Sequence, residues 1–329
     1  MTARRALMTG AGVALLAGSA WTCLAQTRRA RLGLLSVFAL PPPGERTRYE
    51  RALLALMHER GWSEASNLTL EVRGAAPGKP LAAAAAELVA LKPDVLLTSG
   101  TPAVKLLRGL TTQIPIVMDG AGDPVGTGLV ASLARPGGNV TGVSWQLREL
   151  IPKTLSYLHE MVPGARRVDL VNQVNDPGHP FFAKVMREAA QAQGLDCQVQ
   201  EVGSVDELVA EISASRADAI LMLATGMIYA AQQRIAAAAI QRRLPLAITG
   251  GPGRALVVAG LLFCYCANDE EMKRRVADCV DRILRGTRPA DIPVAQPQRY
   301  DFVVNLRTAR AIGLELPRAL LLRVDEAIE

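Results

Sequence analysis

A stretch rich in glycine and proline divides this chain into two halves that share one pattern. Residues 119–126 read Asp-Gly-Ala-Gly-Asp-Pro-Val-Gly and follow directly on the apolar run Ile114–Met118, which predicts a buried strand. Glycine and proline permit backbone conformations that other residues resist, so a sharp turn is expected there. A short helical piece at Leu129–Leu133 and a strand at Asn139–Ser144 are expected next. Such a crossing is a natural place for one lobe to give way to another.

Apolar runs of strand length alternate with segments of helical periodicity on both sides of this crossing. In the first half, strands are expected at 31–37, 68–72, 94–98 and 114–118. In the second half they are expected at 167–171, 197–202, 219–223, 244–248, 260–265 and 300–305. Strands separated by helices imply parallel βαβ units, covered by helices on both faces. The sequence therefore predicts an α/β protein with two Rossmann-like, doubly wound parallel-sheet lobes.

Composition and motifs exclude several classes of function. The 329 residues suffice to bury two cores. The net charge of +6 is spread along the chain without a basic run interleaved with aromatic residues, so no nucleic-acid partner is expected. The three histidines are scattered, which argues against a metal site. Because Gly-x-Ser-x-Gly, a Walker loop and a dinucleotide fingerprint are all missing, no catalytic residue and no cofactor are predicted.

The first 25 residues have the form of an export signal. Arg4 and Arg5 precede an apolar segment, and Ala25 supplies a small residue before the expected cleavage site, which leaves Gln26 as the first mature residue. The apolar segment is short for a membrane-spanning helix. Arg-Arg-x-Leu-Met fits a twin-arginine signal, and an ordinary secretory leader fits as well. Both routes predict a periplasmic protein.

Four cysteines remain once Cys23 is removed with the signal. Cys264 and Cys266 alternate with aromatic residues on an expected strand, and Cys279 falls at the apolar spacing of a helix. Cys197 lies on another expected strand. The cysteines are therefore expected to be small buried hydrophobic side chains, although export would permit disulfides.

The segment after the glycine-rich turn carries a specific signature. It reads Ser132-Leu-Ala-Arg-Pro-Gly-Gly-Asn-Val-Thr-Gly-Val-Ser144. Together with Thr98-Ser-Gly-Thr-Pro-Ala103 and the tail Phe302–Leu314, it resembles the family of ABC transporter substrate-binding proteins related to the tryptophan/tyrosine binders. The resemblance covers nearly the whole mature chain. It implies a type I periplasmic-binding-protein fold with a multi-strand hinge, and an ABC permease in the inner membrane as partner.

The resemblance also implies how the chain divides between the lobes. Three crossing segments are expected, near Thr141–Ser144, Gly253–Gly260 and Pro289–Val294. The first lobe is expected to comprise residues 26–143 and 261–289, so that it takes back the strand and helix Leu261–Gly286. The second lobe is expected to comprise residues 144–260 and 290–329. Gly142 suits a hinge position whose backbone changes angle on closure.

Ligands of open α/β sheets bind beyond the carboxyl ends of the strands. Most of the candidate ligand-binding residues follow such strand ends, and the full set is Ser36, Ser99, Gly100, Thr101, Asp119, Asn175, Asp176, Thr225, Tyr229 and Tyr265. Tyr229 and Tyr265 are expected either to stack on a ligand or to belong to the core. Asp123 is expected to close the glycine-rich turn through the local backbone rather than to bind a ligand.

Two of these groups suggest opposite ends of a zwitterionic ligand. Hydroxyls and free amides at Ser99–Thr101, where a helix starts, attract a carboxylate. Thr101 also fits the N-cap of that helix, with Pro102 at its first position. Asn175 and Asp176 in the other lobe could take an α-ammonium group, although Asn-Asp-Pro-Gly is equally the sequence of an ordinary turn.

These features predict a monomeric solute-binding protein of an ABC importer. Its ligand is expected to be a small organic solute with a carboxylate, for which an amino acid is a good fit, and binding is expected to close the lobes about the hinge. Two alternatives stay open. One is a ligand-sensing subunit for a membrane receptor, and the other is a small-molecule enzyme on the same fold.

Overall fold

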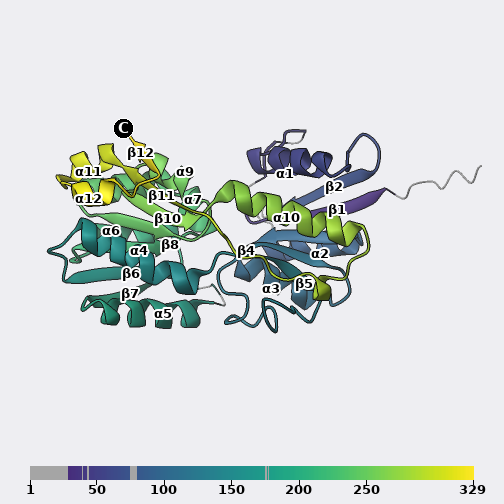
Figure 1. Cartoon of the computed structure of the whole chain (residues 1–329), viewed down its shortest axis with the longest axis horizontal. Helices are drawn as coiled ribbons and strands as arrows, with labels where there is room; N and C mark the ends of the chain where they lie inside the picture. Colours follow the sequence, from purple (N-terminus) through teal and green to yellow (C-terminus); the bar gives the residue numbers. More distant parts are fainter. Residues whose placement is uncertain (1–28, 39, 43, 75–79, 175, 177) are drawn as a thin grey trace, which may run out of the picture.

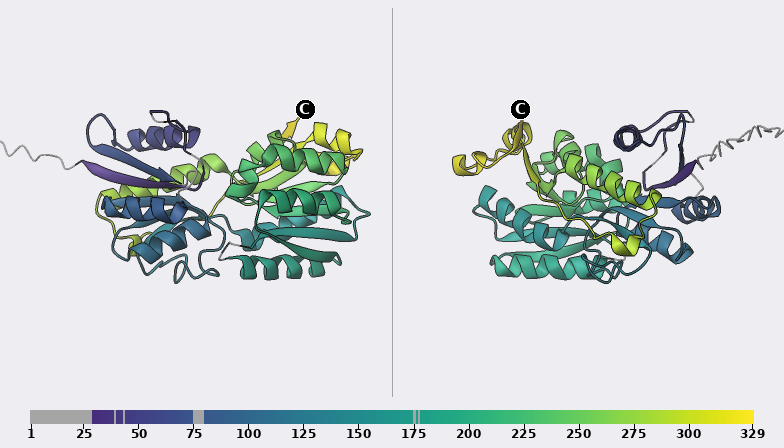
Figure 2. Two further views of the ribbon diagram at one scale, coloured as in Figure 1. Left: turned by 180° about the vertical axis from the view of Figure 1, so that it is seen from behind. Right: turned by 45° about the vertical axis from the view of Figure 1, so that its right-hand side comes forward.

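The computed structural model describes residues 29–38, 40–42, 44–74, 80–174, 176 and 178–329. Within these residues the chain forms two lobes that lie side by side along the long axis, each built on its own sheet (Figure 1). The view from behind shows the same two bodies (Figure 2, left). No helix of the described part is long and apolar enough to cross a membrane. The expected export signal lies outside the described residues.

The first lobe contains a five-stranded parallel sheet in the order β2-β1-β3-β4-β5. Its strands are β1 (Ala30–Ser36), β2 (Leu68–Gly74), β3 (Val95–Ser99), β4 (Ile116–Ala121) and β5 (Val140–Ser144). One face packs against α1 (Arg48–Glu59) and α10 (Asp269–Leu284). The other packs against α2 (Leu81–Ala90) and α3 (Thr101–Leu110). Both faces are covered, as continuous apolar strands require.

The second lobe contains a seven-stranded sheet in the order β12-β11-β10-β9-β8-β6-β7. Its strands are β6 (Arg167–Gln173), β7 (Asp196–Val202), β8 (Ala219–Leu223), β9 (Leu246–Thr249), β10 (Phe263–Ala267), β11 (Tyr300–Asn305) and β12 (Glu326–Ile328). All neighbouring pairs are parallel except β10 and β11, which are antiparallel. The predicted architecture of two parallel-sheet α/β lobes is confirmed, with β11 as the exception.

Helices cover both faces of the second sheet as well. One face packs against α4 (Leu147–Met161), α5 (His179–Ala192), α11 (Leu306–Ile312) and α12 (Arg318–Leu321). The other packs against α6 (Val205–Ala214), α7 (Gly226–Ala230), α8 (Gln232–Gln241) and α9 (Arg254–Val258). A single 3-10 turn, η1 (Pro289–Asp291), precedes β11.

Two sequence-based expectations about local structure are wrong. The strand expected at 260–265 in the first lobe is β10, which pairs with β9 and β11 in the second sheet because Phe263 and Cys264 are buried in that lobe. Only α10, which follows it, covers the first sheet. The helical piece expected at Leu129–Leu133 is a turn, because the Leu129 and Val130 amides both donate to the Pro124 carbonyl.

The crossing segments meet at the centre of the molecule. β5 and the segment after η1 run side by side, since the Ser144 amide donates to the Ala295 carbonyl at 2.9 Å and the Ala295 amide to the Gly142 carbonyl at 2.8 Å. A third crossing was expected at Gly253–Gly260, but this segment forms α9 in the second lobe. The chain crosses instead between β10 and α10, at Asn268.

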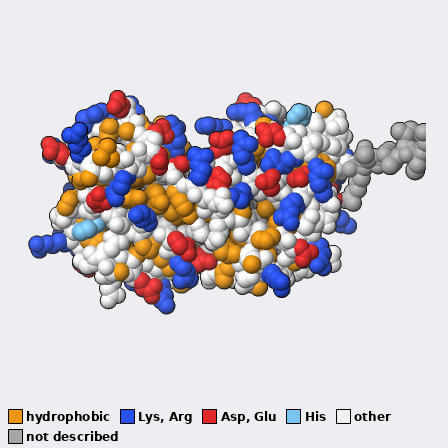
Figure 3. Space-filling model, viewed as in Figure 1, with side chains coloured by type: hydrophobic (Ala, Val, Ile, Leu, Met, Phe, Trp, Pro, Cys, Tyr) orange, Lys and Arg blue, Asp and Glu red, His pale blue; other side chains and the backbone are white. Residues whose placement is uncertain are grey.

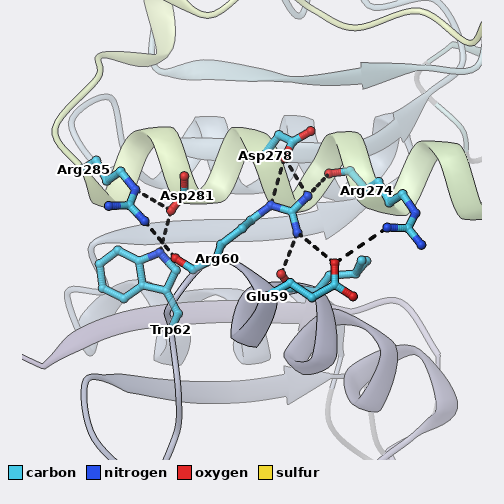
Figure 4. A network of polar contacts seen from close by, with 8 residues as sticks. Glu59, Arg60, Trp62, Arg274, Asp278, Asp281 and Arg285 are labelled. Carbon is cyan, nitrogen blue, oxygen red and sulfur yellow. Dashed lines mark hydrogen bonds and ion pairs between the residues drawn. The ribbon is translucent and has the colours of Figure 1, made fainter.

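A polar network fastens α10 to the end of α1 (Figure 4). The Arg60 guanidinium lies 2.6 Å from the Asp278 carboxylate, and the Trp62 indole N–H donates to Asp281 at 2.8 Å. Arg285 also bonds Asp281, at 2.7 Å, and the Arg60 carbonyl, at 2.8 Å. Side chains of both signs are interspersed over this face of the lobe (Figure 3). These contacts tie α10 to the first lobe, although the chain enters it from the second sheet.

A candidate ligand site between the lobes

The lobes touch where segments beyond the strand ends meet. Phe38, just after β1, packs edge-on against Tyr229 of α7, with ring centroids 5.7 Å apart. Nearby, Gly226 lies so close that an added Cβ would be 3.5 Å from the Val37 carbonyl oxygen. Residues from the carboxyl ends of both sheets therefore face a common region, as expected for open α/β sheets.

Trp145 lies at the centre of this region. Its backbone amide donates to the Ala121 carbonyl at 2.8 Å, which places the side chain beside the end of β4. The indole stands directly against Gly120, where an added Cβ would lie 1.9 Å from its Cε2. The neighbouring ring atom Cη2 lies close to Gly251, beyond β9, where an added Cβ would be 3.6 Å from it. Trp145 thus spans the ends of one strand from each lobe, and only glycine leaves room for it at position 120.

Asp119 directly precedes Gly120, the residue against which the Trp145 indole packs. It lies at the end of β4 and accepts a hydrogen bond from the Tyr49 hydroxyl of α1. Burial raises its pKa from 3.8 to about 6, and the charge of Asp269 on α10 acts in the same direction. The Tyr49 hydrogen bond and the Lys273 charge oppose that rise. Burial and the Asp119 charge also raise the pKa of Tyr49, so its hydroxyl remains a donor.

Helix α3 begins just after β3, the strand next to β4. Its N-cap residue differs from the prediction. The N-cap is Gly100, with φ +81°, and no side chain caps the helix, so Thr101 and Pro102 are its first two residues. Thr101 is a buried residue whose hydroxyl forms no hydrogen bond within the described part of the chain. The Ser99 hydroxyl donates to the Asp119 carbonyl at 2.8 Å. Thr101 and not Ser99 therefore offers an unused hydroxyl.

On the second lobe, the predicted polar pair is only partly visible. Asn175 lies outside the described residues. The Asp176 carboxylate accepts a 2.7 Å hydrogen bond from the Gly178 amide, as in a turn. Burial raises its pKa, while the Gly178 hydrogen bond and the charge of Lys105, on α3 of the other lobe, lower it. The charge of Lys105 thus acts on Asp176 across the lobe boundary.

The two predicted tyrosines lie on opposite faces of the second sheet. Tyr229 packs with the α7–α9 side, and its buried hydroxyl has no partner among the described residues. Tyr265 packs with the α4 side, where it stacks on Tyr300 at 5.5 Å and meets Tyr157 edge-on at 5.1 Å. The structure thus brings Tyr229 to the interlobe region and places Tyr265 in an aromatic cluster.

Three further polar residues are used locally. The Ser36 hydroxyl and the Phe38 backbone bond each other at 2.9 and 3.2 Å. The Thr225 hydroxyl caps α7 by accepting from the Ile228 amide at 3.5 Å. Asp123 closes its turn by accepting from the Val125 and Gly126 amides, as the sequence predicts. The same carboxylate also pairs with Arg148 of α4 at 3.2 Å, a contact between lobes.

Sequence reasoning missed four contributors to the site. Tyr49 matched the apolar spacing of α1, which hid its hydroxyl, and Trp145 directly follows the signature segment without a pattern of its own. Asp269 and Lys273 form an ion pair of 2.5 Å in the first turns of α10. They reach Asp119 because the chain crosses at Asn268, which the expected strand placement concealed. No group of three or more metal-ligating side chains occurs in the described ranges.

Comparisons with known proteins bear on this arrangement. A family described as ABC transporter substrate binding protein matches residues 51–328. The chain belongs to this family. A tyrosine-binding protein from Clostridioides difficile (strain R20291) is 23% identical over 269 residues, which cover 81% of this chain and 76% of the relative.

Two solved structures show how the fold of this substrate-binding protein compares. An ABC domain from Streptococcus pneumonia in complex with L-Trp has a TM-score of 0.80 at 21% identity, over 91% of this chain and 100% of that one. A ligand-free, open substrate binding protein with adhesive properties from Clostridium difficile has a TM-score of 0.64 at 20% identity, over 91% and 99%. The two-lobe fold is that of the type I periplasmic binding proteins.

Proposed function

We propose that this chain captures a small carboxylate-bearing, amino-acid-like solute between its lobes and delivers it to an ABC permease in the inner membrane. The observation that carries the proposal is the convergence of polar groups from both lobes around Trp145. These groups are the Thr101 hydroxyl, the Asp119 carboxylate and the Tyr229 hydroxyl. Family membership and the tyrosine- and tryptophan-binding relatives support it.

Roles follow from the chemistry of these groups. The free hydroxyl of Thr101 and the first amides of α3 suit a carboxylate, which is favoured at a helix N-terminus. Trp145 offers an aromatic face beside the glycines at both strand ends. Tyr229 and Asp176 provide a hydroxyl and a carboxylate from the second lobe. Because a ligand shifts an open–closed equilibrium only through contacts that differ between the two states, groups on both lobes are required.

The arrangement of the lobes supports a closed form. Phe38 contacts Tyr229 and Arg148 contacts Asp123 across the lobe boundary. The chain is also closer in TM-score to the relative solved with L-Trp than to the relative solved ligand-free and open. The proposed moving bodies are the first sheet with α10, and the second sheet with its helices. The protein is proposed to act as a periplasmic monomer after removal of residues 1–25.

Identification of the bound solute tests this function. Protein purified gently from the periplasm and then denatured should release one small carboxylate-bearing compound, detectable by mass spectrometry. Adding that compound back should make the molecule more compact in small-angle X-ray scattering. An unchanged scattering profile with saturating compound would contradict capture between the lobes, and turnover of the compound would favour an enzyme. N-terminal sequencing of the same material should begin near Gln26.

A further inference from the structure

Two cysteines lie side by side on β10. The Cys266 thiol contacts the Cys264 sulfur at 3.6 Å, and both side chains are buried on the α9 side of the second sheet. Residues two apart in a strand point to the same face, so the backbone itself holds the two thiols together. The other cysteines of the described ranges lie on different elements, Cys197 on β7 and Cys279 on α10.

Gly253, which directly precedes α9, leaves a position in front of both sulfurs. A Cβ added there would lie 3.0 Å from the Cys264 sulfur and 3.4 Å from the Cys266 sulfur. The three heavy atoms nearest to that position all belong to these two cysteines. With the 3.6 Å between the sulfurs, the distances form a nearly equilateral triangle. An atom bonded to both sulfurs therefore fits on the Gly253 side, where any other residue would place its Cβ.

The geometry favours a shared metal ion over a disulfide. A disulfide needs sulfurs about 2.05 Å apart and Cα atoms usually within about 6.8 Å of each other. Two residues of a strand already span about 6.6–6.8 Å, and pairing with β9 and β11 on both sides holds β10 extended. By contrast, a tetrahedral ion with metal–sulfur bonds of about 2.3 Å holds two sulfurs about 3.8 Å apart. The observed 3.6 Å is close to that separation.

Burial determines the charge that such an ion should have. Two thiolates carry −2, so a divalent ion leaves a neutral group, whereas uncompensated charge is costly away from water. Thiolates are soft ligands that select zinc-like ions over calcium and magnesium, which take oxygen ligands. The Asp301 carbonyl, 4.0 Å from the Cys266 sulfur, offers an oxygen beside the pair.

We propose that Cys264 and Cys266 bind one thiophilic divalent cation, of the Zn²⁺ and Cd²⁺ class, as a pair of thiolates in front of Gly253. The site uses two protein sulfurs and lies apart from the solute site described above. Neither assignment depends on the other.

Protons must leave when the ion binds. The hydrogen bond with Cys266 and burial raise the pKa of Cys264 well above its usual value, so without metal it is a thiol at neutral pH. The groups that act electrostatically around the pair are Tyr229 of α7, Arg254 of α9 and Asp301 of β11. A divalent ion and two thiols give a neutral dithiolate complex and two protons, and affinity should therefore increase with pH.

Titration with Cd²⁺ tests the site, because thiolate–Cd²⁺ bonds absorb in the ultraviolet by charge transfer. Protein isolated from the periplasm is first reduced with a phosphine and freed of metal with a chelator. The absorption should saturate at about one Cd²⁺ per chain, with about two protons released per ion in calorimetry performed in several buffers. Zn²⁺ should displace Cd²⁺, whereas Ca²⁺ should not. Absence of the band from fully reduced protein would overturn the proposal.

Variants connect the band to this pair. Cys264→Ala and Cys266→Ala should each abolish the saturable band. Gly253→Ala keeps both thiols but places a Cβ 3.0 Å from the Cys264 sulfur, and should weaken Cd²⁺ binding. Cys197→Ala removes one thiol outside the pair and should bind Cd²⁺ like the wild type. A band that persists in Cys264→Ala, or one that is lost in Cys197→Ala, would overturn the assignment. If one cysteine variant does not fold, the other and Gly253→Ala carry the test.

Thiol counting distinguishes metal binding from oxidation. Alkylation of the periplasmic protein in denaturant, followed by mass spectrometry, should modify all four cysteines of the described ranges. A disulfide between Cys264 and Cys266 would overturn the metal assignment. Solute capture is measured separately with the co-purified compound, so its failure would leave the Cd²⁺ results unchanged.

Discussion

Asparagine at position 119 is expected to stabilise the ligand-free protein. Burial raises the pKa of Asp119 to about 6 in the folded chain, compared with 3.8 for an unperturbed aspartate. The fold therefore disfavours the ionised form. A pKa difference of about 2 corresponds to about 3 kcal/mol at most. The side chain is partly solvent-accessible, so a gain of about 1–3 kcal/mol is expected.

Because the fold disfavours ionised Asp119, the stability of the wild type depends on pH in a way that the stability of Asp119→Asn does not. Well below pH 3.8 the carboxyl is protonated in both the folded and the unfolded chain, so it contributes no penalty. Between about pH 4 and 6 the folded chain holds its proton more tightly, and stability falls as pH rises. Above about pH 7 the penalty is complete. Asp119→Asn should therefore match the wild type near pH 4 and exceed it near pH 7.5.

Urea denaturation followed by circular dichroism measures this difference. The free energy of unfolding of each protein is determined at several values from pH 4 to 8, without ligand. Asp196→Asn is the matched control, because an isolated surface change should alter stability by less than about 0.5 kcal/mol. A variant that is less stable than the wild type by the same amount at every pH would refute the reasoning. Asp119 would then be a structural residue held by Tyr49.

Three further substitutions test other parts of the site. Thr101→Val should weaken binding of the co-purified solute about ten- to a hundredfold by calorimetry, with little change in melting temperature because Gly100 is the N-cap of α3. Unchanged affinity would remove Thr101 from the site. Gly120→Ala should displace the Trp145 indole and shift its fluorescence, since the new Cβ would lie 1.9 Å from the ring; an unchanged spectrum would contradict the packing. Gly142→Ala should destabilise the protein by about 1–3 kcal/mol in thermal unfolding, because its Cβ would lie 2.2 Å from the Met118 carbonyl oxygen. A variant as stable as the wild type would indicate that the backbone can move at this position.

The last of these substitutions changes the interpretation of Gly142. The sequence suggested a hinge residue that needs backbone freedom. The structure shows a second reason for glycine, namely the close approach of β5 to Met118 of β4, at φ +132°. Any side chain there disrupts the pairing of the two strands. A substitution at this position therefore reports on the sheet as well as on closure.

Local patterns predicted most of the lobes because each strand and helix is defined by its own residues. The apolar run before Asp119 and the amphipathic pattern of α10 are examples. They could not predict which sheet receives β10, because an alternation of aromatic residues with Cys264 and Cys266 suits a core in either lobe. That choice depends on long-range pairing with β9 and β11.

The candidate site was predictable to the extent that strand ends define it. Asp119 lies near the carboxyl end of β4 and Thr101 follows β3, where the topology places ligands. Tyr49 and Lys273 could not be found in this way, because helices α1 and α10 bring them to Asp119 from distant parts of the sequence. Whether a hydroxyl is free or engaged, as for Thr101 and Ser99, is decided by neighbours that no local pattern reveals.

The passage of the chain from β10 to α10 affects how the molecule can be made. The first sheet is complete once residue 144 has been synthesised, but the helix that buries one of its faces begins at Asp269. During translation, Leu32, Val95 and Val117 thus remain without that cover while residues 147–267 are produced. A fragment that ends before α10 should therefore bind chaperones or aggregate, and the two lobes are expected to mature together near the end of synthesis.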